Sequence, residues 1–248
     1  MALKAITPQS ANRMAVLVIG PAGTGKTSLL RTVCGQYYDA ASGQWHTYDG
    51  IEPEKVCVLS AESGLLCVRD RVQAGTVEGY EIGSLAEFQE AQRMCLSEEF
   101  RAKGYRWIFI DSLTEIASRC AEAMQAKYPS KGDSFKMWGE YNAVMTDIIK
   151  AFRDLQDYNV VFTCLEGVDK DEYNVRHLVP DISGSGLKNR LTSYFDEVFH
   201  MEKRKLDDGT QQTVFSTASP IGLAKDRSGK LAAYEMPNLL GIQHKILN

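Results

Sequence analysis

The 248-residue sequence contains no apolar run long enough to cross a membrane. Its longest unbroken runs, such as residues 15–19 and 107–110, fall far short of the roughly 20 residues that a membrane-spanning helix needs. Residues 1–13 alternate polar and apolar side chains and lack the apolar stretch of a secretory signal peptide. We therefore expect no membrane partner and a location in the cytoplasm.

A strong charge of either sign is also absent. The chain has 28 Lys and Arg residues against 32 Asp and Glu residues, a formal net charge of −4. This balance argues against coating nucleic acid by bulk charge, so any DNA contact would have to be local. The six cysteines never occur at a C-x-x-C spacing, and several lie in apolar runs, where free cysteine packs as a small hydrophobe. We predict neither a disulfide framework nor a zinc site.

What is present is an ordinary globular composition, 44% hydrophobic and 24% charged, in which strand-length apolar runs alternate with helical patterns. This alternation is typical of a parallel sheet with helices on both faces. The predicted strands are residues 14–19, 56–60, 106–110 and 159–164. The predicted helices are residues 27–34, residues 85–103 after the capping box Ser84 to Glu87, and an amphipathic helix with Tyr141, Val144, Ile148, Phe152 and Leu155 on one face.

The last third of the chain has a different character. A polar segment, residues 166–190, precedes strand-like residues 197–203 and 212–216, and Asp208-Gly209 between these strands is a hairpin turn signal. No repeat, low-complexity tract or linker is visible. We therefore expect one domain over residues 1–248, with residues 1–13 as a candidate N-terminal arm and a C-terminal antiparallel hairpin.

A phosphate-binding loop follows the first predicted strand and begins the first predicted helix. The motif G-x-x-x-x-G-K-[S/T] is matched by Gly20, Pro21, Ala22, Gly23, Thr24, Gly25, Lys26 and Thr27, with Ser28 next. Glycines let backbone N–H groups turn inward around phosphate, and the following helix adds its positive N-terminal end. Lys26 supplies a mobile cation, and Thr27 offers a hydroxyl to Mg²⁺. The alternative is a glycine-rich turn that binds no nucleotide.

Three carboxylates are candidates for roles beside the phosphates. Asp111 ends the third predicted strand, where it would hold Mg²⁺ through water, although it could instead only cap the next helix. Glu62, just past the second strand, would orient the attacking water as general base, although it could be a solvated loop residue. Glu115 is a weaker candidate base, because Ser112 and Glu115 form a capping box that would occupy its carboxylate.

Taken together, the P-loop, Leu-Ser-Ala-Glu62-Ser-Gly, Phe-Ile-Asp111-Ser112 and Val160-Val161-Phe162-Thr163 resemble the RecA-like ATPase core. More narrowly, residues 14–231 resemble phage-encoded RecA-core proteins of the single-strand-annealing type, which lack the extra domains of bacterial recombinases. The resemblance implies a three-layer α/β core with a mainly parallel sheet, ATP and Mg²⁺ as cofactors, and Glu62 as the catalytic base.

The resemblance also implies DNA-binding loops at residues 129–136 and 166–190. Both contain glycine and cations, although the second also contains five carboxylates, and both could be ordinary solvated loops. The fourth strand departs from the family, because Thr163 stands near the place of the usual amide that senses the γ-phosphate. The candidate DNA contacts are Lys131, Lys136, Arg176, Lys188 and Arg190.

Lys225 and Arg227 match a family Lys-x-Arg pair that projects across a subunit interface. Their spacing of two places both side chains on the same face of an extended strand, with Asp226 on the other face. Such a pair would stabilise charge on the γ-phosphate of a neighbouring subunit, as an arginine finger does. A solvated turn over residues 225–229 is the alternative.

These observations favour a Mg²⁺-dependent ATPase that binds single-stranded DNA and acts in phage recombination or annealing, in the cytoplasm of a bacterial host. Its expected partners are further copies of itself in a ring or filament, and a single-stranded-DNA-binding protein is a candidate. The alternatives are a replicative-helicase-type motor or helicase loader, and a nucleotide-gated binding module with incidental turnover. A small-molecule P-loop kinase is disfavoured because no arginine-rich lid is visible.

Overall fold

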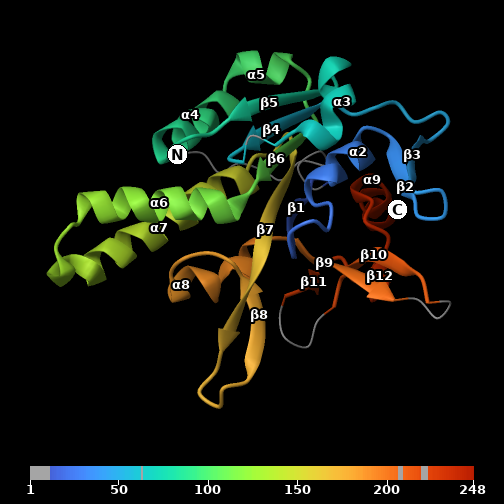
Figure 1. Cartoon of the computed structure of the whole chain (residues 1–248). Helices are drawn as coiled ribbons and strands as arrows, with labels where there is room; N and C mark the ends of the chain where they lie inside the picture. The colour runs from blue at the N-terminus through green and yellow to red at the C-terminus, as the bar shows by residue number, and fades with distance from the viewer. Residues whose placement is uncertain (1–11, 63, 206–208, 219–222) are drawn as a thin grey trace.

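A mostly parallel sheet forms the centre of the molecule (Figure 1). The computed structural model describes residues 12–62, 64–205, 209–218 and 223–248. Six strands pair in parallel in the order β5-β4-β6-β7-β1-β9. Their bounds are β1 (Ala15–Gly20), β4 (Val56–Ser60), β5 (Val77–Glu81), β6 (Trp107–Asp111), β7 (Asn159–Lys170) and β9 (Glu197–Lys205). All four strands expected of the parallel core are therefore found.

Strand β7 lies between β1 and β6, so the P-loop strand and the Asp111 strand are not neighbours. Because the strands are parallel, their carboxyl ends meet along one edge, where open α/β sheets bind ligands. The register pairs Gly20 with Leu165, and Ser60 with Asp111. This arrangement brings the ends of β1, β7, β6 and β4 together, although they come from distant parts of the sequence.

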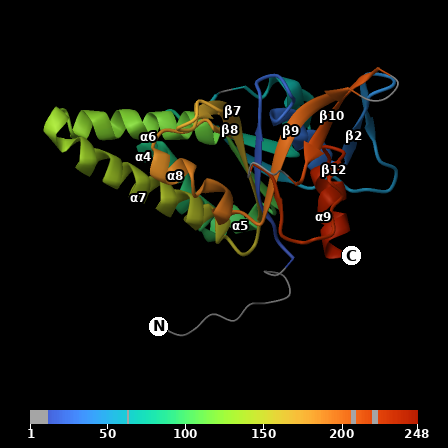
Figure 2. The same ribbon diagram turned by 90° about the horizontal axis from the view of Figure 1, so that it is seen from below.

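Helices cover both faces of the sheet, which gives the expected three layers (Figures 1 and 2). Alternate residues of β1 point to opposite faces: Leu17 and Ile19 join one apolar cluster, and Val16 and Val18 join the other. The first cluster is covered by α4 (Leu85–Cys95), α5 (Glu98–Ala102), α6 (Leu113–Lys127) and α7 (Ser134–Arg153). The second is covered by η1 (Thr27–Leu29), α2 (Leu30–Val33), η2 (Leu66–Val68) and α9 (Leu239–Leu247), with α3 (Arg69–Gln73) after η2.

The predicted C-terminal hairpin is present. Strand β9 pairs antiparallel with β10 (Gln211–Ser216), and Lys205 lies opposite Gln211. Gly209 of the predicted turn has φ 85°, a left-handed conformation that favours glycine, whereas Asp208 lies outside the described residues. Two short strands complete this edge: β12 (Tyr234–Glu235) pairs with β10, and β11 (Lys225–Asp226) pairs with β9. Residues 1–11 of the predicted N-terminal arm also lie outside the described part of the chain.

Two sequence predictions were wrong in detail. The single helix expected over residues 85–103 is divided into α4 and α5, because Ser97 caps a new helix by accepting a hydrogen bond from the Phe100 N–H at 3.1 Å. The polar segment 166–190 is not mainly loop. Strand β7 continues to Lys170 and pairs with β8 (Arg176–Pro180), followed by α8 (Ser185–Lys188) and η4 (Leu191–Tyr194).

A second hairpin, β2 (Gln36–Asp39) and β3 (Gln44–Thr47), was not predicted and follows α2 directly. A short 3-10 helix, η3 (Lys131–Asp133), joins α6 to α7. Over the described residues, no helix combines the length and the apolar content that a membrane crossing would require.

Candidate nucleotide-binding site

The P-loop backbone requires glycine at three positions. Gly23 and Gly25 have φ of 75° and 95°, in the left-handed region where a Cβ is disfavoured. Gly20 is limited by space instead, since a Cβ there would lie 2.3 Å from the carbonyl oxygen of Met201 on β9. The glycines therefore set both the turn of the loop and its close approach to β9.

Lys26 is largely buried, with 9% of its surface exposed. Its Nζ donates hydrogen bonds to the carbonyl oxygens of Gly20, at 2.9 Å, and Pro21, at 2.8 Å. Burial lowers the pKa of Lys26, while the nearby acidic groups, Asp111 first, oppose this effect. The ammonium thus lies in the loop and in a negative environment, where an added phosphate would find both a cation and N–H donors.

Asp111 connects three of the strand ends. Its buried carboxylate, 5% exposed, accepts a hydrogen bond from the Thr27 Oγ1 of the P-loop at 2.7 Å and another from Thr163 Oγ1 on β7. Burial raises the pKa of Asp111, and the two threonine hydroxyls oppose that shift. Thr163 therefore contacts Asp111, the carboxylate predicted to hold Mg²⁺. It can do so because its strand, β7, lies directly beside β6, which Asp111 ends.

The oxygen donors of Thr27 and Asp111 fit Mg²⁺, which prefers hard oxygen ligands and keeps several waters. Among the described residues, no group of three or more His, Cys, Asp and Glu side chains is placed to hold a metal ion. An Mg²⁺ bound here would thus take most of its ligands from phosphate and water. Thr27 would supply its hydroxyl, and Asp111 would hold a metal-bound water.

Glu62 is exposed just beyond the end of β4. The Ser112 hydroxyl donates a 2.6 Å hydrogen bond to its Oε1 and also accepts one from the Glu115 N–H at the start of α6, at 3.4 Å. Because Ser112 directly follows Asp111 in the chain, this hydrogen bond holds the Glu62 carboxylate close to Asp111. This geometry gives Glu62 an oriented carboxylate at the edge where the P-loop lies.

The capping box expected at α6 is only half formed. Ser112 caps the helix as predicted, but the Glu115 carboxylate pairs with Arg119 at 3.2 Å instead of with the backbone. The i, i+4 spacing explains this choice, because it places the two side chains on neighbouring turns of α6. Arg119 also donates to the Ala61 carbonyl at 3.1 Å, next to Glu62.

An acid–base pair that the sequence patterns did not indicate lies at the same edge. His200 Nε2 of β9 is 2.6 Å from Glu166 Oε2 of β7, and both side chains are largely buried. Glu166 is one of the acidic groups that raise the pKa of Lys26. The strand order brings these residues together, because β1 lies between β7 and β9. His200 of β9 pairs with Ile19 of β1, and the next residue, Gly20, pairs with Leu165 of β7, which precedes Glu166.

Lys225 and Arg227 lie beside the beginning of β9, and because β11 ends at Asp226, Arg227 lies beyond the strand that was predicted to carry both side chains. Lys225 Nζ donates to the Phe195 carbonyl, and Arg227 Nη1 lies 3.0 Å from Asp196 Oδ1 while 70% of its side chain stays exposed. Strand β11 pairs with Glu197 and Val198, whereas the P-loop packs against Met201, about 10 Å further along the strand. The structure thus places the pair apart from the P-loop of its own chain.

The predicted DNA contacts occupy two separate places. Lys131 and Lys136 lie where α6 joins α7, and the others lie on or near the β7–β8 hairpin (Figures 1 and 2). Lys188 pairs with Asp169 at 3.2 Å. Arg176 and Arg190 are exposed and have no side-chain ion pair among the described residues. Their role in DNA binding stays a prediction.

The loop, the buried Lys26 and the Thr27–Asp111 contact at the carboxyl edge of a parallel sheet define a P-loop NTPase. A family model described as AAA domain matches residues 12–228, most of the chain. The chain therefore belongs to this AAA domain family of P-loop NTPases. A comparison with curated proteins found no match.

Proposed function

We propose that the chain is a RecA-like ATPase that hydrolyses ATP with Mg²⁺, binds single-stranded DNA and acts as an oligomer in phage recombination or strand annealing. The observation that carries the ATPase proposal is the Asp111 carboxylate, bonded both to Thr27 of the P-loop and to Thr163 of β7, with Glu62 held beside it by Ser112. The residues proposed to bind phosphate, hold the metal and act as base thus lie at one edge, and Lys225 and Arg227 of a neighbouring copy would complete the site.

In the proposed reaction, Lys26 and the loop N–H groups bind the β- and γ-phosphates. Glu62 orients a water for in-line attack on the γ-phosphate and takes up its proton, and the bond to the β-phosphate oxygen breaks. Bound Mg²⁺ would neutralise charge on the phosphates. Ser112 keeps the Glu62 carboxylate in place by its 2.6 Å hydrogen bond.

The route from nucleotide to DNA would run along β7. Thr163 touches Asp111, and three residues later, at Glu166, the same strand begins to pair with β8, which carries Arg176. A change at Asp111 on nucleotide binding would therefore act on the strand that leads into the proposed DNA-binding segment. This placement supports coupling of ATP and DNA without the usual sensor amide.

The test is ATP turnover with and without single-stranded DNA over a series of salt concentrations. We expect DNA to stimulate turnover and salt to remove the stimulation, because phosphate contacts release counterions. Turnover that ignores DNA would favour the nucleotide-gated binding module. Fuel-dependent displacement of a duplex strand would favour the helicase-type motor.

A further inference from the structure

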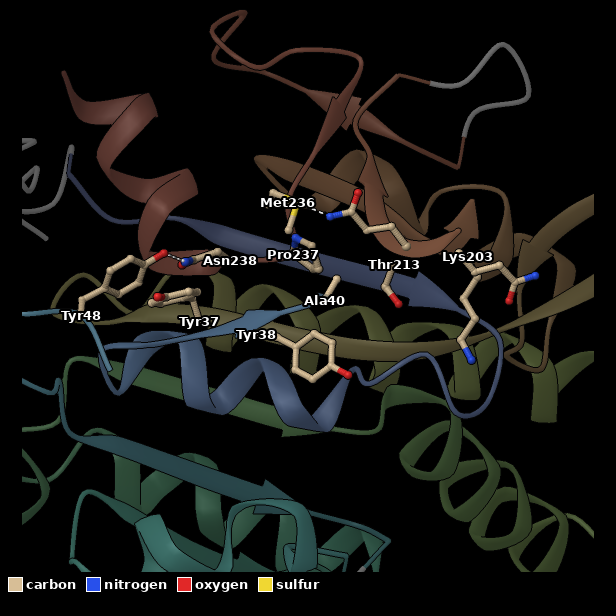
Figure 3. Close-up of a pocket in the computed structure, with 11 residues that line it drawn as sticks. Tyr37, Tyr38, Ala40, Tyr48, Lys203, Thr213, Met236, Pro237 and Asn238 are labelled. Atoms are coloured by element: carbon tan, nitrogen blue, oxygen red, sulfur yellow. Dashed lines mark hydrogen bonds between the residues drawn. The ribbon is translucent and has the colours of Figure 1, made fainter. Parts of the chain in front are cut away.

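A pocket of about 520 Å³ lies beside β9, on the strand face that also contacts the P-loop (Figure 3). Tyr37 and Tyr38 of β2 line one wall, and Thr213 of β10 and Lys203 of β9 line the opposite wall. Figure 3 shows Lys203 at one end, Tyr48 hydrogen-bonded to Asn238 at the other end, and Tyr38 between them. Sites for small molecules span roughly 300–1,000 Å³, so a nucleoside would fit.

The pocket continues from the P-loop along one face of β9. Met201 packs against the loop, since its methyl group lies 3.7 Å from the position that a Cβ on Gly25 would take. Lys203 comes two residues later and therefore points to the same face, about 6–7 Å further along the strand. It lies directly opposite Thr213 in the register of β9 and β10. The phosphate loop and the pocket are thus neighbours on one surface.

The tyrosine wall is fixed to the helix that begins in the P-loop. The guanidinium of Arg31 on α2 lies 5.6 Å from the ring centre of Trp45, and the rings of Trp45 and Tyr38 are 5.5 Å apart. Arg31 also donates to Gln36, the first residue of β2, at 2.9 Å. Tyr38 keeps 47% of its surface exposed, so its ring is held in place and still free to stack.

We propose that this pocket takes the base and ribose of the nucleotide whose phosphates the P-loop binds, with Tyr38 stacking on the base. Aromatic rings bind bases of any sequence through their π-faces. The hydroxyl of Thr213 supplies a polar group for the edge of the base, and Lys203, directly opposite it on β9, supplies a cation on the side of the P-loop. This inference rests on the proposed nucleotide binding and adds the nucleoside subsite to it.

The experiment compares the binding of ATP and of inorganic triphosphate, both with Mg²⁺, by titration calorimetry. For Tyr38→Ala we expect the dissociation constant of ATP to rise roughly 5- to 150-fold, the range for losing one base–aromatic stack, and that of triphosphate to stay unchanged. Tyr38→Phe should keep the wild-type affinity. Thr213→Trp should fill the pocket and weaken ATP but not triphosphate. Tyr173→Ala removes another exposed tyrosine, on the chain between β7 and β8, and serves as the matched control.

Unchanged ATP affinity in both Tyr38→Ala and Thr213→Trp would overturn the nucleoside subsite while leaving the P-loop assignment intact. An equal loss of ATP and triphosphate affinity would also overturn it, because the variants would then act on the phosphate loop. Failure of the wild-type protein to bind either ligand would instead refute the proposed nucleotide binding itself, and the subsite with it. Lys26→Ala should lose the binding of both ATP and triphosphate, and it serves as the reference for a protein without a working phosphate loop.

Discussion

Lys26 is the residue whose replacement best separates phosphate binding from folding. Its ammonium bonds only to carbonyl oxygens of its own loop, and burial already disfavours its charge. We therefore expect Lys26→Ala to abolish ATP binding and turnover while the melting temperature stays close to that of the wild type. Calorimetry and thermal denaturation measure the two effects. Wild-type turnover in this variant would contradict the assignment of the loop.

Glu62 and Glu115 offer a matched test of the general base. Glu62→Gln keeps an oxygen that can accept the Ser112 hydrogen bond but removes basicity, so ATP should still bind while hydrolysis falls by about 10²–10⁴. Glu115→Gln is the control, because that carboxylate pairs with Arg119. A large loss for Glu115→Gln with none for Glu62→Gln would show that Glu115, and not Glu62, is the general base.

Glu197, at the start of β9, gives a prediction on pH. Burial, helped by the nearby negative charge of Asp226, raises the pKa of this carboxyl to about 8. The folded protein then keeps a proton that the unfolded chain releases above its ordinary pKa of about 4.5, so stability is lost as the pH rises from about 5 to about 8. Glu197→Gln removes this loss.

Thermal denaturation at several pH values would measure that effect. Near pH 5, Glu197→Gln and wild type should melt at similar temperatures, and at pH 9 the variant should melt higher by roughly 5–10 °C. Glu122→Gln, at an exposed position of α6, should show no such trend. A difference that does not change between pH 5 and 9 would contradict the raised pKa.

At the scale of elements, the sequence predicted those parts of the fold that local patterns determine. The four buried strands are continuous apolar runs, and Gly35 and Gly104 follow the ends of their helices with φ of 75° and 74°. The β7–β8 hairpin was missed because the end of β7 is polar and exposed, with Val168 60% exposed, and because the apolar run in β8 is only residues 178–180. The break between α4 and α5 was also missed, because the helical pattern continues through residues 85–103 and only the cap formed by Ser97 interrupts the helix.

The candidate site likewise contains residues that the sequence predicted and contacts that it did not. The P-loop, Asp111 and Glu62 follow from a motif and from strand ends, which are local in sequence. The contact of Thr163 with Asp111 and the pair Glu166–His200 depend on the order of the strands. Sequence patterns that act over a few residues carry no information about that order, so these contacts could not be predicted from them.

The β7–β8 region allows a direct test of DNA binding. Lys188 pairs with Asp169 of β7, and Arg190 has no ion pair among the residues that the structure describes. We expect Lys188→Ala with Arg190→Ala to weaken binding to all single-stranded sequences alike and to flatten its salt dependence, because contacts to phosphate carry little base information. Fluorescence anisotropy over a salt series measures both quantities.

Arg93→Ala with Arg101→Ala is the matched control for charge, since both side chains are exposed on α4 and α5, away from the hairpin (Figure 1). That variant should bind DNA as the wild type does. If the pair at 188 and 190 leaves both affinity and salt slope unchanged, the segment is an ordinary solvated surface.

At the scale of the whole molecule, the surface charge favours local contacts over bulk attraction. The net charge is −4, and many surface cations are paired with carboxylates, as Lys103 is with Glu78 and Lys127 with Glu140. Such exposed pairs contribute little to stability but reduce the positive field that DNA would feel. The proposed oligomer would repeat along one strand of DNA those cations that have no ion pair among the described residues, such as Arg176 and Arg190.

Lys225 and Arg227 test that proposal, because they lie too far along β9 to serve the P-loop of their own chain. About 10 Å separates the β11 pairing from Met201, where the loop packs. The Arg227 side chain is 70% exposed, and its single ion pair, with Asp196, can be exchanged for a contact with phosphate at little cost. In an oligomer the pair could reach the γ-phosphate bound by a neighbour.

Lys225→Ala with Arg227→Ala should therefore bind ATP and turn it over poorly, and mixing this variant with Lys26→Ala protein should restore part of the activity. Each variant alone lacks one half of the composite site, whereas a mixed interface pairs an intact P-loop from one chain with an intact Lys225–Arg227 from the next. ATP turnover across mixing ratios measures the rescue, and light scattering shows whether the two variants assemble together. Mixtures that assemble but stay inactive would place both residues outside the neighbour's site and would remove the main argument that activity requires an oligomer.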